Sequence, residues 1–553
     1  MAFEDLLEQA GGLGLFQALQ VLTLVLPALL VPPQMLLENF SAAVPGHRCW
    51  VPLLDNSTAQ AGVTGAPRPE ALLAVAIPPG PDRQPHQCRR FRQPQWQLLD
   101  PNATAANWSE AATEPCVDGW VYDRSTFAST IVAEWDLVCD SEGLKPLGQS
   151  IFMAGILVGA AAFGLLSSRL GRKPMLTWGC LQVAASGTAT IFAPNFPVYC
   201  GLRFLSAFGL AGLILVLMTL TVEWTTTSRR AVTMTILGCT FSTGQMALGG
   251  LAVALRDWRT LQLALSVPLF AAALMSWWLP ESARWLIITG KPDRALRELT
   301  KVARINGHKE AKKTLTMEVL LSNMEEMASA KAHRSVLDLF RVPELRCRTW
   351  TLMAVNFTLT VSYYGLVLDL QSLGSDIFLL QILFGAVDFL GRAATAFFLR
   401  LLGRRATLAA SHALAGSSIL ANALLPRDWP TLRVALAVLG KGCFGTDLTC
   451  LSLYKNELFP TSLRMTADGL QQSVSRLGAM LGPLVRMARQ ALPLLPPLSY
   501  GLAPVVSSLG VLLFLPETQG LPLPDTIQDL EGQRSAKARG SRREVAVMES
   551  TWL

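Results

Sequence analysis

The sequence predicts an all-α polytopic membrane protein built from two repeated halves of six helices each. Of the 553 residues, 51% are apolar and 16% are charged, whereas about 25% of the residues in a typical soluble protein are charged. The charges cluster between apolar stretches of about 20 residues, the length that crosses the hydrocarbon core of a bilayer. Three short motifs also recur along the chain at a nearly constant spacing. These features exclude a soluble multidomain enzyme and a disordered chain.

The chain is predicted to begin with a short cytosolic segment, residues 1–13, and a first transmembrane helix at 14–37. The first segment is acidic, with Glu4, Asp5 and Glu8, and no small-residue cleavage site follows the helix. A secretory signal peptide would begin with basic residues instead. We therefore expect the first helix to be retained and the N-terminus to face the cytosol.

The longest polar segment, residues 38–145, is predicted to form a glycosylated, disulfide-bonded extracellular loop domain. Several acceptor sequences for N-linked glycans beside an even number of cysteines are typical of an oxidising exterior. Four cysteines allow three pairings, and the sequence does not choose among them. The glycan acceptors are Asn39, Asn56, Asn102 and Asn107, and the cysteines are Cys49, Cys88, Cys116 and Cys139.

Eleven further apolar runs complete twelve predicted transmembrane helices. Basic residues concentrate in the connectors after the even-numbered runs, which places those connectors in the cytosol and the glycan acceptors outside. Helices 2–6 fall within 146–280, a cytosolic central loop spans 281–348, helices 7–12 fall within 349–516, and a cytosolic tail spans 517–553. The runs lie at 147–167, 175–193, 198–222, 232–255, 261–279, 350–368, 377–399, 406–425, 432–454, 466–487 and 496–515.

Three motifs show that the second half of the chain repeats the first. The segment from Gly164 to Lys173 returns 232 residues later as the segment from Ala396 to Arg405. The helix-ending Glu223 returns as Glu457, and Pro-Glu-Ser at 280–282 returns as Pro-Glu-Thr at 516–518, at offsets of 234 and 236 residues. Two six-helix halves related by an axis along the membrane normal form the major facilitator fold.

Arginines in the repeated loops and glutamates at the ends of helices 4, 6, 10 and 12 are predicted to form a cytosolic gate. Ion pairs at such positions can form in one conformation and break in another, which would make a latch between the two bundles. The alternative is ordinary positive-inside charge combined with helix capping. The residues are Arg169, Arg172, Glu223, Glu281, Arg284, Arg404, Glu457 and Glu517.

The repeated loop and the segment Pro280-Glu-Ser-Ala-Arg-Trp285 resemble signatures of major facilitator transporters. Four further stretches resemble the organic anion branch of solute carrier family 22, and the resemblance covers nearly the whole chain. These stretches are Met35–Ala43, Cys88–Trp96, Tyr363–Leu366 and Glu457–Thr461. The resemblance implies a secondary-active exchanger that moves amphipathic anions, such as steroid sulfates and urate, against a dicarboxylate in the plasma membrane of kidney or placental epithelium.

Charged residues within the apolar runs of the second half predict where substrate binds. Such residues are costly in a membrane and usually face a cavity. Asp388 and Arg392 lie one helical turn apart and could pair with each other, whereas Lys441 and Asp447 do not share a face. A desolvated arginine offers a planar pair of donors to carboxylate or sulfate. We therefore predict that Arg392, Lys441 and Arg476 hold the anion, as the family resemblance also implies for Arg392 and Arg476.

Aromatic and amide side chains are predicted to complete the site. A ligand cavity is mostly apolar, with a few polar groups that orient the ligand. In the seventh run, Asn356 and Tyr363 lie on one stripe beside Tyr364, and Phe241 and Gln245 lie one turn apart in the fifth run. The resemblance places Phe241 and both tyrosines near the substrate. Ordinary helix packing is the alternative for each aromatic residue.

The C-terminal sequence fits a ligand of PDZ domains. Such a tail adds a strand to the edge of the domain's sheet, with Thr551 third from the end and Leu553 at the end. No metal-ligand spacing of histidines and no phosphate-binding loop is present, so we expect no enzyme activity, cofactor, metal or nucleic-acid partner. The alternatives are a urate-specialised exchanger, an organic cation transporter of the same family, or a non-transporting receptor or scaffold.

Overall fold

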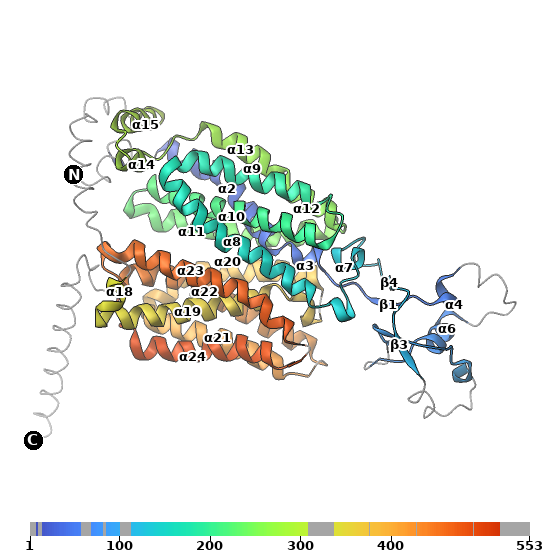
Figure 1. The fold of residues 1–553 in the computed structure, drawn as a ribbon. Helices are drawn as coiled ribbons and strands as arrows, with labels where there is room; N and C mark the ends of the chain where they lie inside the picture. The colour runs from blue at the N-terminus through green and yellow to red at the C-terminus, as the bar shows by residue number, and fades with distance from the viewer. Residues whose placement is uncertain are drawn as a thin grey trace, which may run out of the picture.

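The structure is a computed structural model, and it describes residues 7–8, 14–56, 68–80, 84–99, 112–307, 337–374, 376–426, 428–489 and 491–519. Figure 1 shows two groups of long helices lying side by side, with a smaller domain standing off one end. We call the end that carries this smaller domain the outer end and the opposite end the inner end. The sequence predicts that the inner end faces the cytosol.

The N-terminal bundle contains six helical spans, the last of which is divided into two segments at Pro268. A proline at the first position of a helix lacks only an N–H that would have no helical partner there, so Pro268 starts a new segment without breaking the span. The spans are α2 (Leu15–Leu36), α8 (Leu144–Leu170), α9 (Arg172–Thr190), α10 (Phe196–Glu223), α11 (Thr227–Ala254), and α12 (Trp258–Ser266) with α13 (Pro268–Met275).

The C-terminal bundle repeats this arrangement with six helices. Each overlaps its predicted run, and most extend a few residues beyond it, because polar and charged residues continue a helix past the apolar stretch. The helices are α19 (Pro343–Val367), α20 (Ile377–Leu401), α21 (Gly403–Leu424), α22 (Pro430–Leu458), α23 (Thr461–Met487) and α24 (Leu495–Phe514).

Eight of these spans are long and apolar enough by themselves to cross a membrane. The other four, α9, α19, α21 and α23, are long helices with more small or polar residues. They complete the bundles by packing along other helices: α9 on α10, α19 on α23, and α21 on α24. The twelve-span organisation therefore rests on helix packing as well as on hydropathy.

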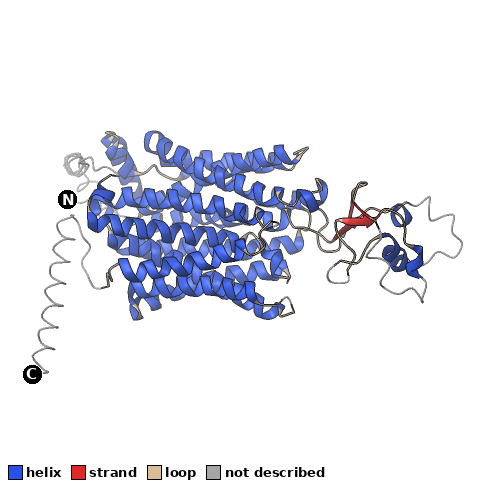
Figure 2. Cartoon of the chain, turned by 60° about the horizontal axis from the view of Figure 1, so that its bottom comes forward, coloured by secondary structure: helices blue, strands red, loops and turns tan. Residues whose placement is uncertain are grey.

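The segment between α2 and α8 forms the small domain at the outer end. Figure 2 shows its short strands in red, away from the helical bundle. The strands pair as two antiparallel ladders, β1 (His47–Cys49) with β4 (Trp120–Tyr122) and β2 (Arg89–Phe91) with β3 (Thr113–Pro115). Short helices α4 (Pro52–Asp55) and α6 (Pro69–Ala76) complete it, whereas α3 (Glu38–Ser41) continues the first span and α7 (Ile131–Glu134) packs against α10 and α12.

Two disulfides hold this domain together. Cys49 is bonded to Cys116, and Cys88 is bonded to Cys139. The predicted disulfides are confirmed, and the structure selects one of the three pairings. Cys139 lies five residues before α8, so the second disulfide also joins the domain to the start of a membrane span.

One predicted glycan acceptor is wrong. The Asn39 side chain is only 3% exposed, and its Nδ2 donates a hydrogen bond to the Val367 carbonyl at 2.8 Å. A glycan needs an exposed amide, so Asn39 cannot carry one in this structure. Asn56 is exposed, whereas Asn102 and Asn107 lie outside the described residues.

Candidate functional site

The Asp388 carboxylate is the centre of a buried charge cluster between the two bundles. It accepts hydrogen bonds from Lys441 Nζ at 2.8 Å and from Arg392 Nε at 2.9 Å. It also accepts one from the Ser242 hydroxyl at 2.6 Å, which comes from α11 of the N-terminal bundle. The expected pair of Asp388 and Arg392 is present. Lys441, which the sequence left without a partner, shares the same carboxylate.

This cluster carries more positive than negative charge. Asp388 and Lys441 are fully buried, and the Arg392 side chain is 16% exposed. A buried charge is tolerated only where it is paired, and one carboxylate here balances two cations. The three side chains therefore keep an excess of one positive charge, and the partly exposed Arg392 is its accessible member.

Arg476 on α23 adds a second excess positive charge. It is partly buried, and in the described part of the chain its guanidinium has neither a hydrogen bond nor an ion pair. Tyr364 on α19 is its titratable neighbour in the described part of the chain, and a neutral phenol does not balance the guanidinium charge. The neighbouring acid on the same helix, Asp468, is paired with Lys455, so it does not neutralise Arg476.

Aromatic rings surround the cations. The Arg392 guanidinium lies 5.8 Å from the centre of the Phe241 ring, and Lys441 Nζ lies 4.6 Å from the centre of the Tyr363 ring. Tyr363 packs edge-on against Tyr364 at 5.1 Å and against Phe444 at 6.2 Å. Phe241 from the N-terminal bundle and Tyr363 from the C-terminal bundle thus lie beside the two cations that share Asp388. Phe444 was not singled out in the sequence, where nothing distinguishes it from other helix phenylalanines.

The two predicted amide side chains lie in different places. Gln245 Nε2 lies 3.4 Å from the Tyr363 hydroxyl and donates to it, and the buried Gln245 Oε1 has no partner among the described residues. Asn356 donates instead to Gln471 Oε1 at 2.9 Å, which joins α19 to α23. Gln245 is therefore part of the site, whereas Asn356 contributes to helix packing beside it.

Hydrogen bonds between the two bundles gather at the outer end and form what we call the outer clamp. Arg486 on α23 donates to the Leu368 carbonyl at 2.9 Å and to Gln149 Oε1 on α8. Gln149 Nε2 donates to the same carbonyl at 3.3 Å. Gln371 accepts from the Val44 N–H at 2.8 Å. These contacts join the two bundles at the outer end.

The residues of the predicted cytosolic gate form two matching clusters at the inner end. Arg172 pairs with Glu223 at 3.0 Å, and Arg404 pairs with Glu457 at 3.1 Å. Glu281 accepts the Arg172 N–H and Glu517 accepts the Arg404 N–H, each at 2.9 Å. Burial raises the pKa of the Glu281 carboxyl, although these N–H donors and the nearby Arg172 oppose the shift.

The expected latch between the bundles is not made of these pairs in this conformation. Each cluster lies within one bundle, because the arginine of each repeated loop reaches the glutamates of its own half. Arg169 and Arg284 are exposed and take no part in either cluster. Thr551 and Leu553 of the predicted PDZ ligand lie outside the described residues.

The sequence also missed a buried polar network in the C-terminal bundle. His412 on α21 lies 2.9 Å from Asp447 on α22, and both side chains are fully buried. The other His412 nitrogen lies 2.9 Å from the Ser507 hydroxyl on α24. Asp447 was expected to have a partner of its own, but it lies 35 positions after His412, and a separation of that size gave no signal of the contact.

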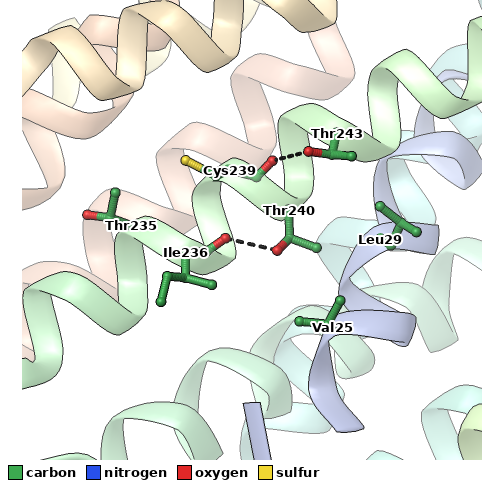
Figure 3. Close-up of a pocket in the computed structure, with 7 residues that line it drawn as sticks. All are labelled: Val25, Leu29, Thr235, Ile236, Cys239, Thr240 and Thr243. Atoms are coloured by element: carbon green, nitrogen blue, oxygen red, sulfur yellow. Dashed lines mark hydrogen bonds between the residues drawn. The ribbon is translucent and has the colours of Figure 1, made fainter. Parts of the chain in front are cut away.

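A separate apolar pocket of about 440 Å³ lies between α2 and α11, as Figure 3 shows. Its threonines turn their hydroxyls back to their own helix: Thr240 donates to the Ile236 carbonyl and Thr243 to the Cys239 carbonyl, each at 2.9 Å. These residues lie on the side of α11 away from Phe241, by the period of an α-helix. The pocket is therefore distinct from the charge cluster.

Known proteins that are similar to this chain are membrane transporters. Residues 114–529 match the family described as sugar (and other) transporters. The chain is 71% identical to human (Homo sapiens) solute carrier family 22 member 11 and 56% identical to human member 12, with 100% of both chains covered in each case. It is 46% identical to the human steroid transmembrane transporter SLC22A24, again over 100% of both chains.

Solved structures agree on the fold. The inward-open xylose transporter XylE from E. coli superposes with a TM-score of 0.58, covering 91% of this chain and 97% of that one. The identity is only 13%, so this likeness concerns the arrangement of helices alone. It confirms the predicted major facilitator fold.

Proposed function

The chain belongs to solute carrier family 22, and from that premise we propose that it exchanges organic anions across the plasma membrane. The protein is a transporter and not an enzyme. The single observation that supports an anionic substrate is the excess of positive charge at the site. Arg392 and Lys441 share one carboxylate, and Arg476 has no ionic partner among the described residues.

Each part of the site supplies one element of recognition. The Arg476 guanidinium would bind the sulfate or carboxylate of the substrate through two parallel hydrogen bonds. The rings of Phe241, Tyr363 and Tyr364 would cover a flat apolar body, and aromatic surface of this kind suits a steroid or aryl group. The free Gln245 Oε1 would accept a hydrogen bond from a hydroxyl or N–H group of the ligand.

Steroid sulfates and urate are the substrates that fit this proposal. A relative that is 46% identical over its full length is named a steroid transmembrane transporter, which supports the steroid class. Urate is a small anion that would use the charge cluster and a single aromatic ring. A dicarboxylate from the cytosol would occupy the same cationic site on the return step.

Exchange would proceed by alternating access. The two bundles rock about the site, so that it opens to one side of the membrane at a time. The outer clamp would close the outside, and the gate residues at the inner end would rearrange in the opposite conformation. At the C-terminus, Thr551 and Leu553 would attach the transporter to a PDZ scaffold.

The proposal is tested by changing Arg476 to Asp in cells that are preloaded with glutarate. Uptake of labelled estrone sulfate should fall at least tenfold, since a hydrogen-bonded charge contributes about 1.5–3 kcal/mol and Asp also repels the anion. Arg476→Lys is the matched control, which keeps the charge but loses the paired donors, and it should retain part of the uptake. The amount of transporter at the cell surface must be equal for the native protein and the two variants.

The same cells distinguish the other functions that the sequence left open. Labelled urate taken up with no estrone sulfate would indicate a urate-specialised exchanger, and uptake of tetraethylammonium would indicate a cation transporter. No uptake of any of the three, at normal surface expression, would favour a receptor or scaffold. Wild-type uptake of estrone sulfate by Arg476→Asp would overturn the assignment of the anion site.

A further inference from the structure

Helix α15 (Pro292–Ile305) is an amphipathic helix at the inner end, outside the membrane spans (Figure 1). One face is packed against the protein: Ala295, Leu299, Val302 and Ala303 are at most 1% exposed. This packing fixes the rotation of the helix about its axis. The opposite face is therefore held toward the surroundings of the protein.

Four cations form a continuous stripe on that opposite face. Arg294, Arg297, Lys301 and Arg304 follow one another at spacings of three, four and three residues, which places them on one side of an α-helix. All four are exposed, and in the part of the chain that the structure describes none of their side chains has an ion pair or a hydrogen bond. The stripe is about 15 Å long at 1.5 Å per residue.

Acidic neighbours do not neutralise the stripe. Asp293 is exposed at the start of the helix, and Glu298 lies beside the stripe, but neither forms an ion pair with its cations. One oxygen of Glu298 is buried and has no partner among the described residues, so this carboxylate is turned partly into the protein. The exposed face keeps an excess of positive charge.

Both ends of the α15 segment are tied to places where membrane spans begin or end. Asn306, just after α15, accepts a hydrogen bond from the Phe16 N–H at 2.9 Å, at the first turn of α2. Before α15, Trp285 Nε1 donates to the Ser168 carbonyl at the inner end of α8 at 2.9 Å. These contacts hold the α15 segment beside the inner ends of α2 and α8, where two membrane spans begin and end.

A tryptophan marks the same level. Trp277 closes the sixth span, is 77% exposed, and has Lys173 Nζ 5.9 Å from the centre of its ring. Exposed tryptophans at the ends of spans sit among lipid headgroups. Lys291, immediately before α15, lies in the same way over Trp285, 5.4 Å from the ring centre. Trp285 itself is only 6% exposed, so Trp277 is the tryptophan that marks the lipid headgroup level, and Lys291 adds a cation at the start of α15.

We propose that the stripe of Arg294, Arg297, Lys301 and Arg304 is a binding site for anionic phospholipid headgroups of the cytosolic leaflet. A basic surface at that leaflet attracts phosphatidylserine and phosphoinositides, with a gain near fivefold in affinity for each cation. The guanidinium groups bind phosphate oxygens in pairs. The site is independent of the anion site between the bundles.

The experiment measures lipid binding to the full-length protein in an uncharged detergent. Native mass spectrometry with dioctanoyl phosphatidylcholine, phosphatidylserine or phosphatidylinositol 4,5-bisphosphate counts the bound lipids and gives their apparent affinities. The two anionic lipids should bind the native protein at least tenfold more tightly than phosphatidylcholine. The variant Arg294→Gln/Arg297→Gln/Lys301→Gln/Arg304→Gln should lose this preference.

A charge-preserving variant is the matched control. Arg294→Lys/Arg297→Lys/Lys301→Arg/Arg304→Lys should keep the preference, because the stripe retains all four charges. Equal melting temperatures of the three proteins without added lipid show that the glutamine variant is folded. Inorganic phosphate and inositol trisphosphate should compete weakly, since the glycerol chains contribute to binding.

Three results would overturn the proposal. An unchanged preference for anionic lipid in the glutamine variant would place the binding elsewhere. Full displacement of the lipid by inositol trisphosphate at the same concentration would show a site for a soluble phosphate compound instead. A loss of preference in the charge-preserving variant would likewise count against it, because electrostatic attraction would then not explain the binding.

Discussion

At the scale of single residues, the shared carboxylate of Asp388 determines the charge of the site. A buried ion pair is costly to form, because both charges lose their hydration, and costly to break, because the remaining charge has no partner. Asp388 serves Lys441 and Arg392 together, at 2.8 and 2.9 Å. Removing it would leave two neighbouring cations that repel each other.

We predict that Asp388→Asn destabilises the purified transporter by about 3–5 kcal/mol, the usual cost of breaking a buried pair. Adding Lys441→Met should recover part of the loss, since it removes the fully buried cation while the partly exposed Arg392 can still contact water. Thermal unfolding in detergent measures both. A double variant no more stable than Asp388→Asn alone would contradict the shared-carboxylate interpretation.

At the scale of elements, the turn between α8 and α9 and its repeat between α20 and α21 depend on glycine. Gly171 has a φ of +104° and Gly403 a φ of +82°, a region that side chains rarely enter. A Cβ on Gly171 would also lie 2.4 Å from Glu281 Oε2, and one on Gly403 would lie 2.6 Å from Glu517 Oε2. In each half the glutamate that caps the next helix fills the space of the missing side chain.

We predict that Gly171→Ala and Gly403→Ala each destabilise the protein by about 1–3 kcal/mol, the cost of strained backbone, and more where the glutamate must move. Surface expression and thermal unfolding measure the effect. Gly164→Ala is the control on the same helix, because the nearest atom to its Cβ is 4.0 Å away. Equal losses at Gly164 and Gly171 would contradict the special role of the turn.

At the scale of the whole molecule, the outer clamp joins segments that are far apart in the sequence. Arg486 and Gln149 are 337 residues apart, and both bind the Leu368 carbonyl at the end of α19. The bundles can rock only if these hydrogen bonds break. In the proposed alternating-access cycle, the strength of the clamp would therefore contribute to the balance between the two conformations.

We predict that Gln149→Ala shifts the protein toward the conformation that is open to the outside. The shift should correspond to one or two hydrogen bonds, about 1–2 kcal/mol, or roughly a five- to thirtyfold change in the ratio of conformations. Spin-label distances between the outer ends of α8 and α23 measure it. Arg489→Ala is the control, because Arg489 is 52% exposed and contacts only Asp369 among the described residues, at 3.7 Å. An unchanged distance distribution in Gln149→Ala would refute the clamp.

Local patterns in the sequence were enough for part of the site. Arg392 and Asp388 pair because their four-residue spacing brings them together on any helix, so this contact was predictable. Lys441 and Ser242 reach the same carboxylate across 53 and 146 residues, and no spacing indicates that. For Asn39 the local pattern predicted too much. Its glycan acceptor sequence is intact, but its side chain is buried, and that burial is a property of the packed fold.

The sequence by itself determined the twelve helices, the repeat of the two halves and the family. The length of the apolar runs, the turn motifs and the spacing at which the motifs repeat are all properties of the chain. It also determined that cations would lie within the second half. Only the tertiary structure decided which cation remains without a partner, where the bundles meet, and that the arginines of the inner end pair within their own half. The physical reason is that a charge has its effect through its neighbours, and in a helical membrane protein most neighbours come from other helices.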